Sequence, residues 1–375
     1  MINFWNYNQE YKNYKKHILK LIDKTLIRGN IFFGDELNKF EKKFTKKYKS
    51  KYGVAVKSCT DALFISLKAA GIKPGDEVIT AANTAIPTIS AIILAGAKPK
   101  LVDICNDYLI DINQIKKVIT SKTKAIIPVH LYGQSCDMDK LLKIAKKFNL
   151  KIIEDCAQAQ GAKFKNKFVG KFGDLGCFSF YPTKILGAYG DGGFIITNNR
   201  KLYLKAKRIR FYGIETEVKK NIFLNQYYSN EFGINSRMDE IQSSILNFKL
   251  NKVDNFILKR RRLAKIYFKN LSNTDLKLPN ENKYCNHVYH LFTVRHKKAN
   301  KIIEQLKKNK VLARVIYQYP IHKMRAFKKY SFNSSKLKNT EKISKEIFSL
   351  PLYPELKISH VVKICNILKN ILHNI

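Results

Sequence analysis

The 375-residue chain has few acidic side chains and, over its second part, no glycine. Asp and Glu number 29 against 70 Lys and Arg, which gives a formal net charge of +41. All 17 glycines lie at or before Gly233, so the last 142 residues contain none. Because glycine marks turns and close backbone approaches, its loss predicts a change of architecture near residue 235.

Cysteine is also sparse and shows no metal-binding spacing. The seven cysteines are an odd number and include no Cys-x-x-Cys pair. This pattern argues against a disulfide framework and against a structural zinc site. We therefore expect buried thiols in a reducing compartment, and no metal.

Long apolar runs are missing as well. The longest uncharged stretch, residues 78–97, is interrupted by Thr, Asn, Pro and Ser, so no membrane span is expected. Residues 1–12 contain no apolar core of a signal peptide. Together with the cysteine content, these absences predict a cytoplasmic protein with no membrane partner.

The basic excess is spread along the chain. Proteins that bind nucleic acid usually concentrate their charge on one face or in a tail, whereas here lysine is mixed throughout with Ile, Asn, Tyr and Phe. The densest run, residues 259–262, is flanked by apolar residues at helical spacing. We interpret it as the solvated face of a helix, and no dedicated nucleic-acid partner is expected.

Strand-like and helix-like segments alternate over the first 200 residues. Strands are predicted at residues 52–56, 77–80, 99–104, 124–129, 151–155, 176–181 and 192–197, and helices at 60–70, 84–94 and 137–148. This alternation is typical of a mostly parallel α/β sheet covered on both faces. One long amphipathic helix, from Met238 to about Asn270, is predicted to lead into a smaller α/β domain.

Two common phosphate-binding patterns are absent, although eight glycines lie between residues 161 and 193. The full Gly-x-Gly-x-x-Gly pattern between a strand and a helix is missing, and so is the loop that ends in Gly-Lys-Ser/Thr. A dinucleotide site and a phosphate loop of the nucleotide-hydrolase type are therefore not expected.

Polar residues follow two of the predicted strands, where ligands collect in open α/β sheets. Ser58 and Thr60 lie between a strand and a helix. Such a turn either binds an anion at the helix N-terminus or only caps the helix. Asp155 ends another strand and is followed by small residues and Gln158, which leaves room for a flat ring.

Lys184 lies within the glycine-dense region, five residues after Ser179. A lysine that forms an imine, combined with a carboxylate that holds a pyridine nitrogen protonated, is the minimum equipment for pyridoxal phosphate chemistry. Lys184 and Asp155 are the candidates for these two roles.

Several ordered motifs together resemble the DegT/DnrJ/StrS-type nucleotide-sugar aminotransferases, and the resemblance covers almost the whole chain. The motifs are residues 75–79, 128–134, 154–158, 173–174, 178–184, 186–193, 233–242 and 349–354. The resemblance implies the aspartate aminotransferase fold, that is, the fold type I of pyridoxal phosphate-dependent transferases. It implies an N-terminal arm and large cofactor-binding domain at 1–245, and a linking helix and small C-terminal domain at 246–375.

The resemblance also implies roles for individual residues. Lys184 matches the lysine that forms the imine with pyridoxal 5'-phosphate, and Asp155 matches the carboxylate paired with the pyridine nitrogen. Gln158 matches the residue near the phenolic oxygen of the ring. Thr60, Asp61 and Ser179 fall where the family holds the cofactor phosphate.

Asn235 matches an asparagine that reaches the phosphate from the partner subunit, which implies a homodimer with shared active sites. From the residues alone, Asn235 and Ser236 also fit a simple cap before a helix at Met238.

The implied activity is a transaminase that takes its amino group from L-glutamate and gives it to a nucleotide-linked keto sugar. The motifs look most like members that act at C3 of a dTDP-3-keto-6-deoxyhexose, with C4 amination of a UDP- or dTDP-4-keto sugar as the alternative. Tyr319 and His322 fall where the family meets the nucleotide-sugar, or are structural aromatics. A non-catalytic, regulatory protein that binds pyridoxal phosphate is a further alternative.

Three positions depart from the family pattern. Cys59 lies where a glycine is common in the phosphate turn, and Gln160 replaces a frequent histidine. Ala85 occupies the position at which some members stack an aromatic ring on the cofactor. The stacking partner is therefore not identified by the sequence.

Overall fold

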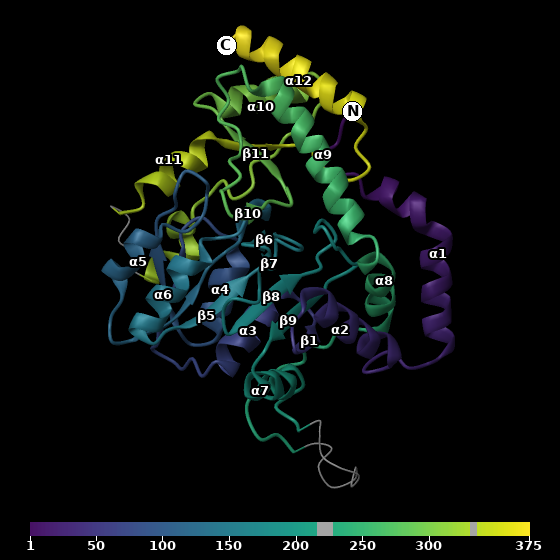
Figure 1. Ribbon diagram of the computed structural model, residues 1–375, viewed down its shortest axis with the longest axis vertical. Coiled ribbons are helices and arrows are strands. Elements are labelled where there is room, and N and C mark those ends of the chain that lie inside the picture. The colour runs from purple at the N-terminus through teal and green to yellow at the C-terminus, as the bar shows by residue number, and fades with distance from the viewer. Residues whose placement is uncertain (216–227, 331–335) are drawn as a thin grey trace.

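A seven-stranded sheet forms the centre of the structure, a computed structural model that describes residues 1–215, 228–330 and 336–375 (Figure 1). Its strands lie in the order β1 (Tyr52–Val56), β9 (Gly193–Thr197), β8 (Leu175–Ser179), β5 (Lys151–Asp155), β4 (Thr123–Ile127), β2 (Glu77–Ala81) and β3 (Lys98–Val102). Neighbouring strands are parallel except at β9, which is antiparallel to both β1 and β8. The predicted mostly parallel sheet is confirmed.

Side chains of β8 and β9 alternate between two hydrophobic clusters, so the sheet is buried on both faces. Cys177 and Ile195 belong to a cluster that includes helix α3 (Cys59–Ala69). Phe178 and Phe194 face the opposite way and pack on Phe44 of helix α2 (Asp35–Tyr48), with ring centroids 5.2 and 4.5 Å from it. Helices therefore cover both sides, as the sequence pattern predicts.

Further helices surround this sheet, and a second group of elements follows them. The first group comprises α1 (Tyr7–Ile27), α4 (Ile86–Leu94), α5 (Ile112–Val118), α6 (Met138–Phe148), α7 (Arg200–Arg210) and α8 (Glu240–Leu250). The second comprises α9 (Val253–Leu271), α10 (Ala299–Lys308), α11 (Lys338–Glu346) and α12 (Ile358–His373), with β11 (Phe292–Arg295) antiparallel to β12 (Ile347–Leu350). In the described residues, every helix is too short or too polar to cross a membrane.

The second group has its own hydrophobic cluster, which contains Tyr267, Phe292 and Phe348. Ile2 joins this cluster and bridges to Val311, so the N-terminus lies beside the C-terminal elements (Figure 1). Short strands β6 (Lys163–Phe164), β7 (Lys167–Phe168) and β10 (Cys285–Asn286) form a small sheet of their own. The division at residues 245 and 246 stays a prediction.

The single long helix predicted from Met238 to Asn270 is wrong, because the structure breaks it into α8 and α9. Asn251 is the C-cap of α8, and Lys252 precedes the first residue of α9. Asn251, Asp254 and Asn255 all lie at this break, and these residue types favour helix ends over helix interiors. The break lets α8 pack on α1 and α2 while α9 packs on α12.

The solvated face predicted for residues 259–262 is also wrong at one position. Arg260 is fully buried, and its guanidinium donates hydrogen bonds to the backbone carbonyls of His290 (3.0 Å) and Leu352 (2.8 Å). Burial lowers the pKa of Arg260 to about 10. Arg260 is thus buried because it bonds to backbone carbonyls distant in sequence, although helical spacing alone places it at the solvent face.

Glu154, one residue before the end of β5, ties a distant loop to the sheet. Its fully buried carboxylate accepts hydrogen bonds from the backbone N–H groups of Gly170 (2.7 Å), Phe172 (2.7 Å) and Gly173 (2.8 Å). His130 Nε2 lies 3.0 Å from the same group. The loop at residues 170–173 leads directly into β8, so Glu154 positions the strand that ends at Ser179.

We expect Glu154→Gln to destabilise the protein strongly. The amide would place an N–H group opposite backbone N–H donors that now bond to the carboxylate. Loss of a buried, charged hydrogen-bond acceptor costs about 3 kcal/mol. Urea unfolding followed by circular dichroism measures the loss. Glu304→Gln is the matched control, because Glu304 is exposed and, within the described part of the chain, pairs with Lys308 alone, so a change below about 0.5 kcal/mol is expected there. Equal stability of the two variants would contradict the role of Glu154.

Candidate active site

A cavity of about 350 Å³ opens where β1, β5 and β8 end. Five residues singled out from the sequence line it together: Thr60, Asp155, Gln158, Ser179 and Lys184. This is the edge at which ligands bind in open α/β sheets, and the volume is that of a small-molecule site. The structure therefore brings the predicted lysine and carboxylate into one space.

Asp155 is buried at the end of β5 and is held by two hydrogen bonds. Its Oδ1 accepts from the backbone N–H of Ala157 (3.1 Å), and its Oδ2 accepts from the hydroxyl of Thr88 (2.9 Å). Burial raises the pKa of the Asp155 carboxyl above its ordinary value, while these hydrogen bonds and Lys184 act in the opposite direction. The carboxylate is thus fixed in orientation and gains from a cationic partner in the cavity.

Thr88 was missed by sequence reasoning as a partner of Asp155. It lies on α4, 67 residues before the carboxylate, and its hydroxyl also lies 2.9 Å from that of Thr84. The two threonines form a short chain of hydroxyls that ends on Asp155 Oδ2. Thr84 precedes α4, and a spacing of four residues is too common to predict such a pairing.

Lys184 is half-buried in the cavity wall, in the turn that follows β8. Its backbone N–H donates to the carbonyl of Tyr181 at 2.9 Å. A Cβ at Gly187 would collide with the carbonyl oxygen of Pro182, so the turn closes only around a glycine. Burial lowers the pKa of the Lys184 ammonium, while Cys59 and Asp155 act to raise it. A lysine in this setting gives up its proton more readily than one in water.

The turn between β1 and α3 carries a helix N-terminus to the cavity. Ser58 caps α3, because its hydroxyl accepts from the backbone N–H of Asp61 at 3.1 Å. The predicted cap is confirmed, anion binding at this turn stays a prediction, and Thr60 lines the cavity at the same helix end. A Cβ at Gly193 would collide with the carbonyl of Ser58, so β9 packs against this turn at a distance that only a glycine permits. Backbone N–H groups and the helix dipole make this corner suited to an anion.

Asp61 does not line the cavity. Its Oδ2 accepts a hydrogen bond from the hydroxyl of Ser236 at 2.7 Å, and the same hydroxyl accepts from the backbone N–H of Lys57. Ser236 therefore joins the turn to the segment before α8. The predicted cap by Asn235 and Ser236 is wrong, since α8 begins at Glu240 and is capped by Asp239.

Tyr317 lines the cavity, although the sequence did not single it out as part of the site. Its hydroxyl accepts from the Gln158 side-chain amide at 2.7 Å, and Gln158 Oε1 accepts from the backbone N–H of Tyr132. Tyr317 has a φ of +64°, a left-handed conformation that non-glycine residues rarely adopt. A strained tyrosine beside Gln158 points to a functional position. Ala85 also lines the cavity.

Three other predicted residues lie outside this cavity. Asn235 is exposed, and its Oδ1 accepts from Arg237 Nε at 3.0 Å. Tyr319 is 65% exposed and lines a different cavity. His322 is buried, with its Nε2 2.9 Å from Glu341. Their predicted contacts with phosphate and sugar stay predictions.

Comparison with protein families identifies the class. The model of the DegT/DnrJ/EryC1/StrS aminotransferase family matches residues 12–369. The chain belongs to this family, and the predicted family, fold and enzyme class are confirmed.

Particular relatives cover nearly the full chain. The dTDP-3-amino-3,6-dideoxy-alpha-D-galactopyranose transaminase of Aneurinibacillus thermoaerophilus is 40% identical over 97% of this chain and 98% of its own. A pleiotropic regulatory protein of Geobacillus stearothermophilus is 40% identical over 93% of each chain. The crystal structure of NtdA from Bacillus subtilis with bound cofactor PMP superimposes with a TM-score of 0.89 and 30% identity, over 99% of this chain and 85% of that one.

We expect Lys184 to react with a small amine-specific reagent at lower pH than the exposed lysines of the same protein. Burial lowers its pKa, so below the ordinary lysine value of about 10.4 more of it is the neutral amine. Peptide mass spectrometry after brief labelling of cofactor-free protein over a pH series gives the midpoint. Asp155→Asn removes a charge that favours the ammonium, so the midpoint falls further. A midpoint at or above that of the exposed lysines would contradict this account.

Proposed function

We propose that the chain transfers an amino group from L-glutamate to the keto carbon of a nucleotide-linked deoxysugar, at C3 of a dTDP-3-keto-6-deoxyhexose. The observation that carries the proposal is the placement of Lys184 and Asp155 in one cavity beside a helix N-terminus. Pyridoxal phosphate is the cofactor of this site; when bound, it supplies an aldehyde that condenses with amines and a ring that accepts electrons.

The residues present fit this cofactor. The N-terminus of α3 with Thr60, together with Ser179, would hold the phosphate, because both hydroxyl residues line the cavity and a helix N-terminus favours an anion. Asp155 would hold a proton on the ring nitrogen, since its buried carboxylate gains from a cation. Gln158 would reach the phenolic oxygen through its amide.

The chain's own groups account for the proton transfers. Lys184 would hold the cofactor through its side-chain amine, and that amine, when free, would take the proton from the amino-acid carbon. The lowered pKa suits this role, because an ordinary ammonium has no lone pair with which to act as a base. In its ionised form Asp155 would stabilise a positive charge on the ring nitrogen.

The C3 position and the dTDP carrier are the finer part of the proposal. A relative at 40% identity is named for a dTDP-3-amino-3,6-dideoxy sugar, which supports both. C4 amination of a UDP- or dTDP-4-keto sugar is the alternative. A second candidate is a regulatory protein that binds the cofactor without turnover. It is favoured by the relative of 40% identity that is named as a pleiotropic regulatory protein.

The cofactor assignment predicts a covalent bond to one lysine. Borohydride reduction of the protein with pyridoxal phosphate should leave a stable adduct on Lys184 and on no other lysine in stoichiometric yield, as measured by peptide mass spectrometry. Lys184→Ala should show no such adduct and no turnover. An adduct spread over surface lysines in the wild type would exclude the assignment.

Substrate choice is tested with a panel of dTDP- and UDP-linked 3-keto and 4-keto sugars and [15N]glutamate. We expect label in the dTDP-3-keto-6-deoxyhexose product, with nuclear magnetic resonance placing the nitrogen on C3. Label on C4 would support the alternative. Formation of a cofactor adduct on Lys184 without labelled sugar from any substrate would favour the regulatory candidate.

We further propose a homodimer in which each Asn235 serves the partner's site. Asn235 lies outside the cavity of its own chain, on a surface that also exposes Phe232 (77%) and Phe32 (39%). Arg237 lies over the Phe32 ring, 4.4 Å from its centroid. An exposed surface of this kind is typical of an interface between subunits.

Mixed dimers test the shared site. Lys184→Ala and Asn235→Asp should each be inactive alone, because the second change places a negative charge near the phosphate. Unfolded and refolded together, the two variants form mixed dimers in which one site has both intact residues, so about a quarter of wild-type activity returns. If Asn235 acts within its own chain, no activity returns.

A further inference from the structure

Gln160 closes the base of the loop that carries Lys184. Its side chain is buried, and its amide makes three hydrogen bonds to the loop backbone. The nitrogen donates to the carbonyls of Ser179 (2.6 Å) and Leu186 (3.1 Å), and the oxygen accepts from the N–H of Leu186 (2.7 Å). One side chain thus joins the two ends of a loop whose middle contains Lys184.

The place of the Lys184 amine depends on this backbone. Within the part of the chain that the structure describes, no group hydrogen-bonds to the Lys184 ammonium or forms an ion pair with it. Its position at the cavity wall therefore follows from the course of the loop. A backbone hydrogen bond from Ala188 to the carbonyl of Phe180 (2.7 Å) also crosses the base. That bond would remain without the Gln160 amide, so we expect the fold to persist and the loop to loosen.

An amide is the group that fits these three contacts. It offers two N–H donors and a carbonyl acceptor at once. Histidine, which is frequent at this position in the family, has one donor and one acceptor in its neutral form, so it could replace at most two of the three bonds. An ionised carboxylate has no donor and would face the carbonyls of Ser179 and Leu186. The departure from the family pattern at Gln160 thus changes how the loop is held.

We propose that Gln160 is a positioning residue, which fixes the Lys184 amine in the cavity for its reaction with the cofactor aldehyde. This role rests on the proposed function, in which Lys184 forms that bond. In the reaction the neutral amine bonds the aldehyde carbon, and the aldehyde oxygen leaves as water together with both amine protons. An amine held in place reaches the aldehyde at a smaller entropic cost than a mobile one. Gln160 does not line the cavity, so it acts through Lys184.

The hold on the loop is tested on the full, cofactor-free protein by hydrogen–deuterium exchange. Gln160→Met keeps an unbranched side chain but no amide. We expect faster exchange throughout residues 180–186, including the N–H of Lys184, which bonds to Tyr181 and not to Gln160. Exchange in β5 should stay unchanged.

Gln134→Met is the matched control for the loss of a buried amide. Gln134 is a buried glutamine whose side-chain oxygen also accepts from a backbone N–H, that of Asn282 at 2.7 Å. This bond lies away from the Lys184 loop. The control should therefore leave exchange in residues 180–186 as it is in the wild type.

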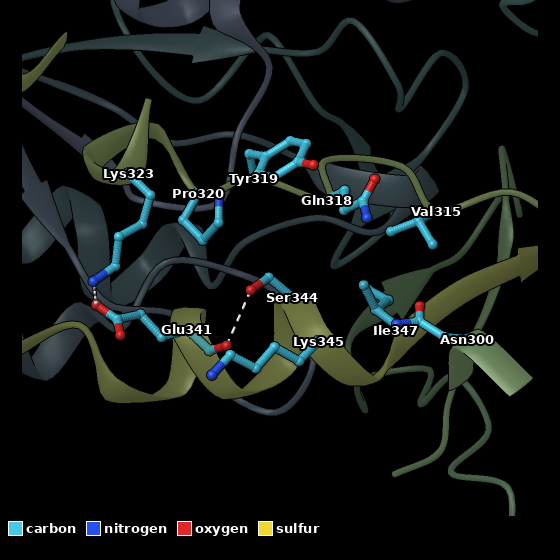
Figure 2. A pocket seen from close by; sticks show the side chains of 10 residues that line it. All are labelled: Asn300, Val315, Gln318, Tyr319, Pro320, Lys323, Glu341, Ser344, Lys345 and Ile347. Carbon is cyan, nitrogen blue, oxygen red and sulfur yellow. Dashed lines mark hydrogen bonds and ion pairs between the residues drawn. The ribbon is translucent and has the colours of Figure 1, made fainter. Parts of the chain in front are cut away.

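The effect on Lys184 is measured as the rate of adduct formation with pyridoxal phosphate, trapped with borohydride and located by peptide mass spectrometry. We expect Gln160→Met to form the Lys184 adduct about tenfold more slowly than the wild type, because a loosened amine is less often in place. Gln160→His should lie between the two, since it can keep two bonds, and it carries the test if the Met variant does not fold. Gln318→Met makes the same change at an exposed glutamine, which lines a separate cavity of about 380 Å³ (Figure 2), and should react as the wild type does.

Unchanged exchange in residues 180–186, or an unchanged adduct rate, in the Gln160 variants would overturn the proposal. The same changes in Gln134→Met would also overturn it, because they would then come from general destabilisation. A wild type that forms no adduct on Lys184 would contradict the proposed function itself. In that case the exchange measurement would still decide whether Gln160 holds the loop.

Discussion

Two consecutive carboxylates at the end of β5 organise the site. Successive side chains of a strand point to opposite faces, so Glu154 and Asp155 face opposite sides of the sheet. Glu154 binds the backbone of residues 170–173 and so positions β8, which leads to Ser179 and Lys184. Asp155 faces the cavity in which that lysine lies. A shift of one residue in β5 would turn each carboxylate to the opposite face of the sheet, so neither could make its present contacts.

The scarcity of acidic residues makes their positions informative. Several of the 29 serve as buried acceptors for backbone N–H groups at helix starts. Glu240 accepts from the N–H groups of Gly34 and Leu37 at the beginning of α2. Asp103 accepts from the N–H and hydroxyl of Thr340 near the beginning of α11. These carboxylates connect elements that lie more than 200 residues apart, in a chain whose surface is dominated by lysine.

The order of residues along the chain predicted those parts of the structure that depend on neighbouring residues in the sequence. The strands of the sheet, the cap at Ser58 and the cavity residues Asp155 and Lys184 could be found because apolar runs and turn residues mark strand ends. The break at Asn251 is marked only by weak helix formers, which a continuous apolar stripe concealed.

Other parts depend on contacts between distant segments. Thr88 bonds Asp155 from another helix, and Tyr317 reaches Gln158 across 159 residues. Arg260 is buried because carbonyls from two other segments meet it. No spacing in the sequence encodes such pairings, since they arise only when the elements are packed.

The central claim is that Asp155 acts on the chemistry through a bound ring and not by shaping the cavity. The most direct test is the reaction of cofactor-loaded protein with glutamate alone, with no sugar present. The wild type should release one 2-oxoglutarate per subunit. Asp155→Asn should keep the covalent bond to Lys184 but release 2-oxoglutarate at least a hundredfold more slowly. Release at the wild-type rate from Asp155→Asn would contradict the account.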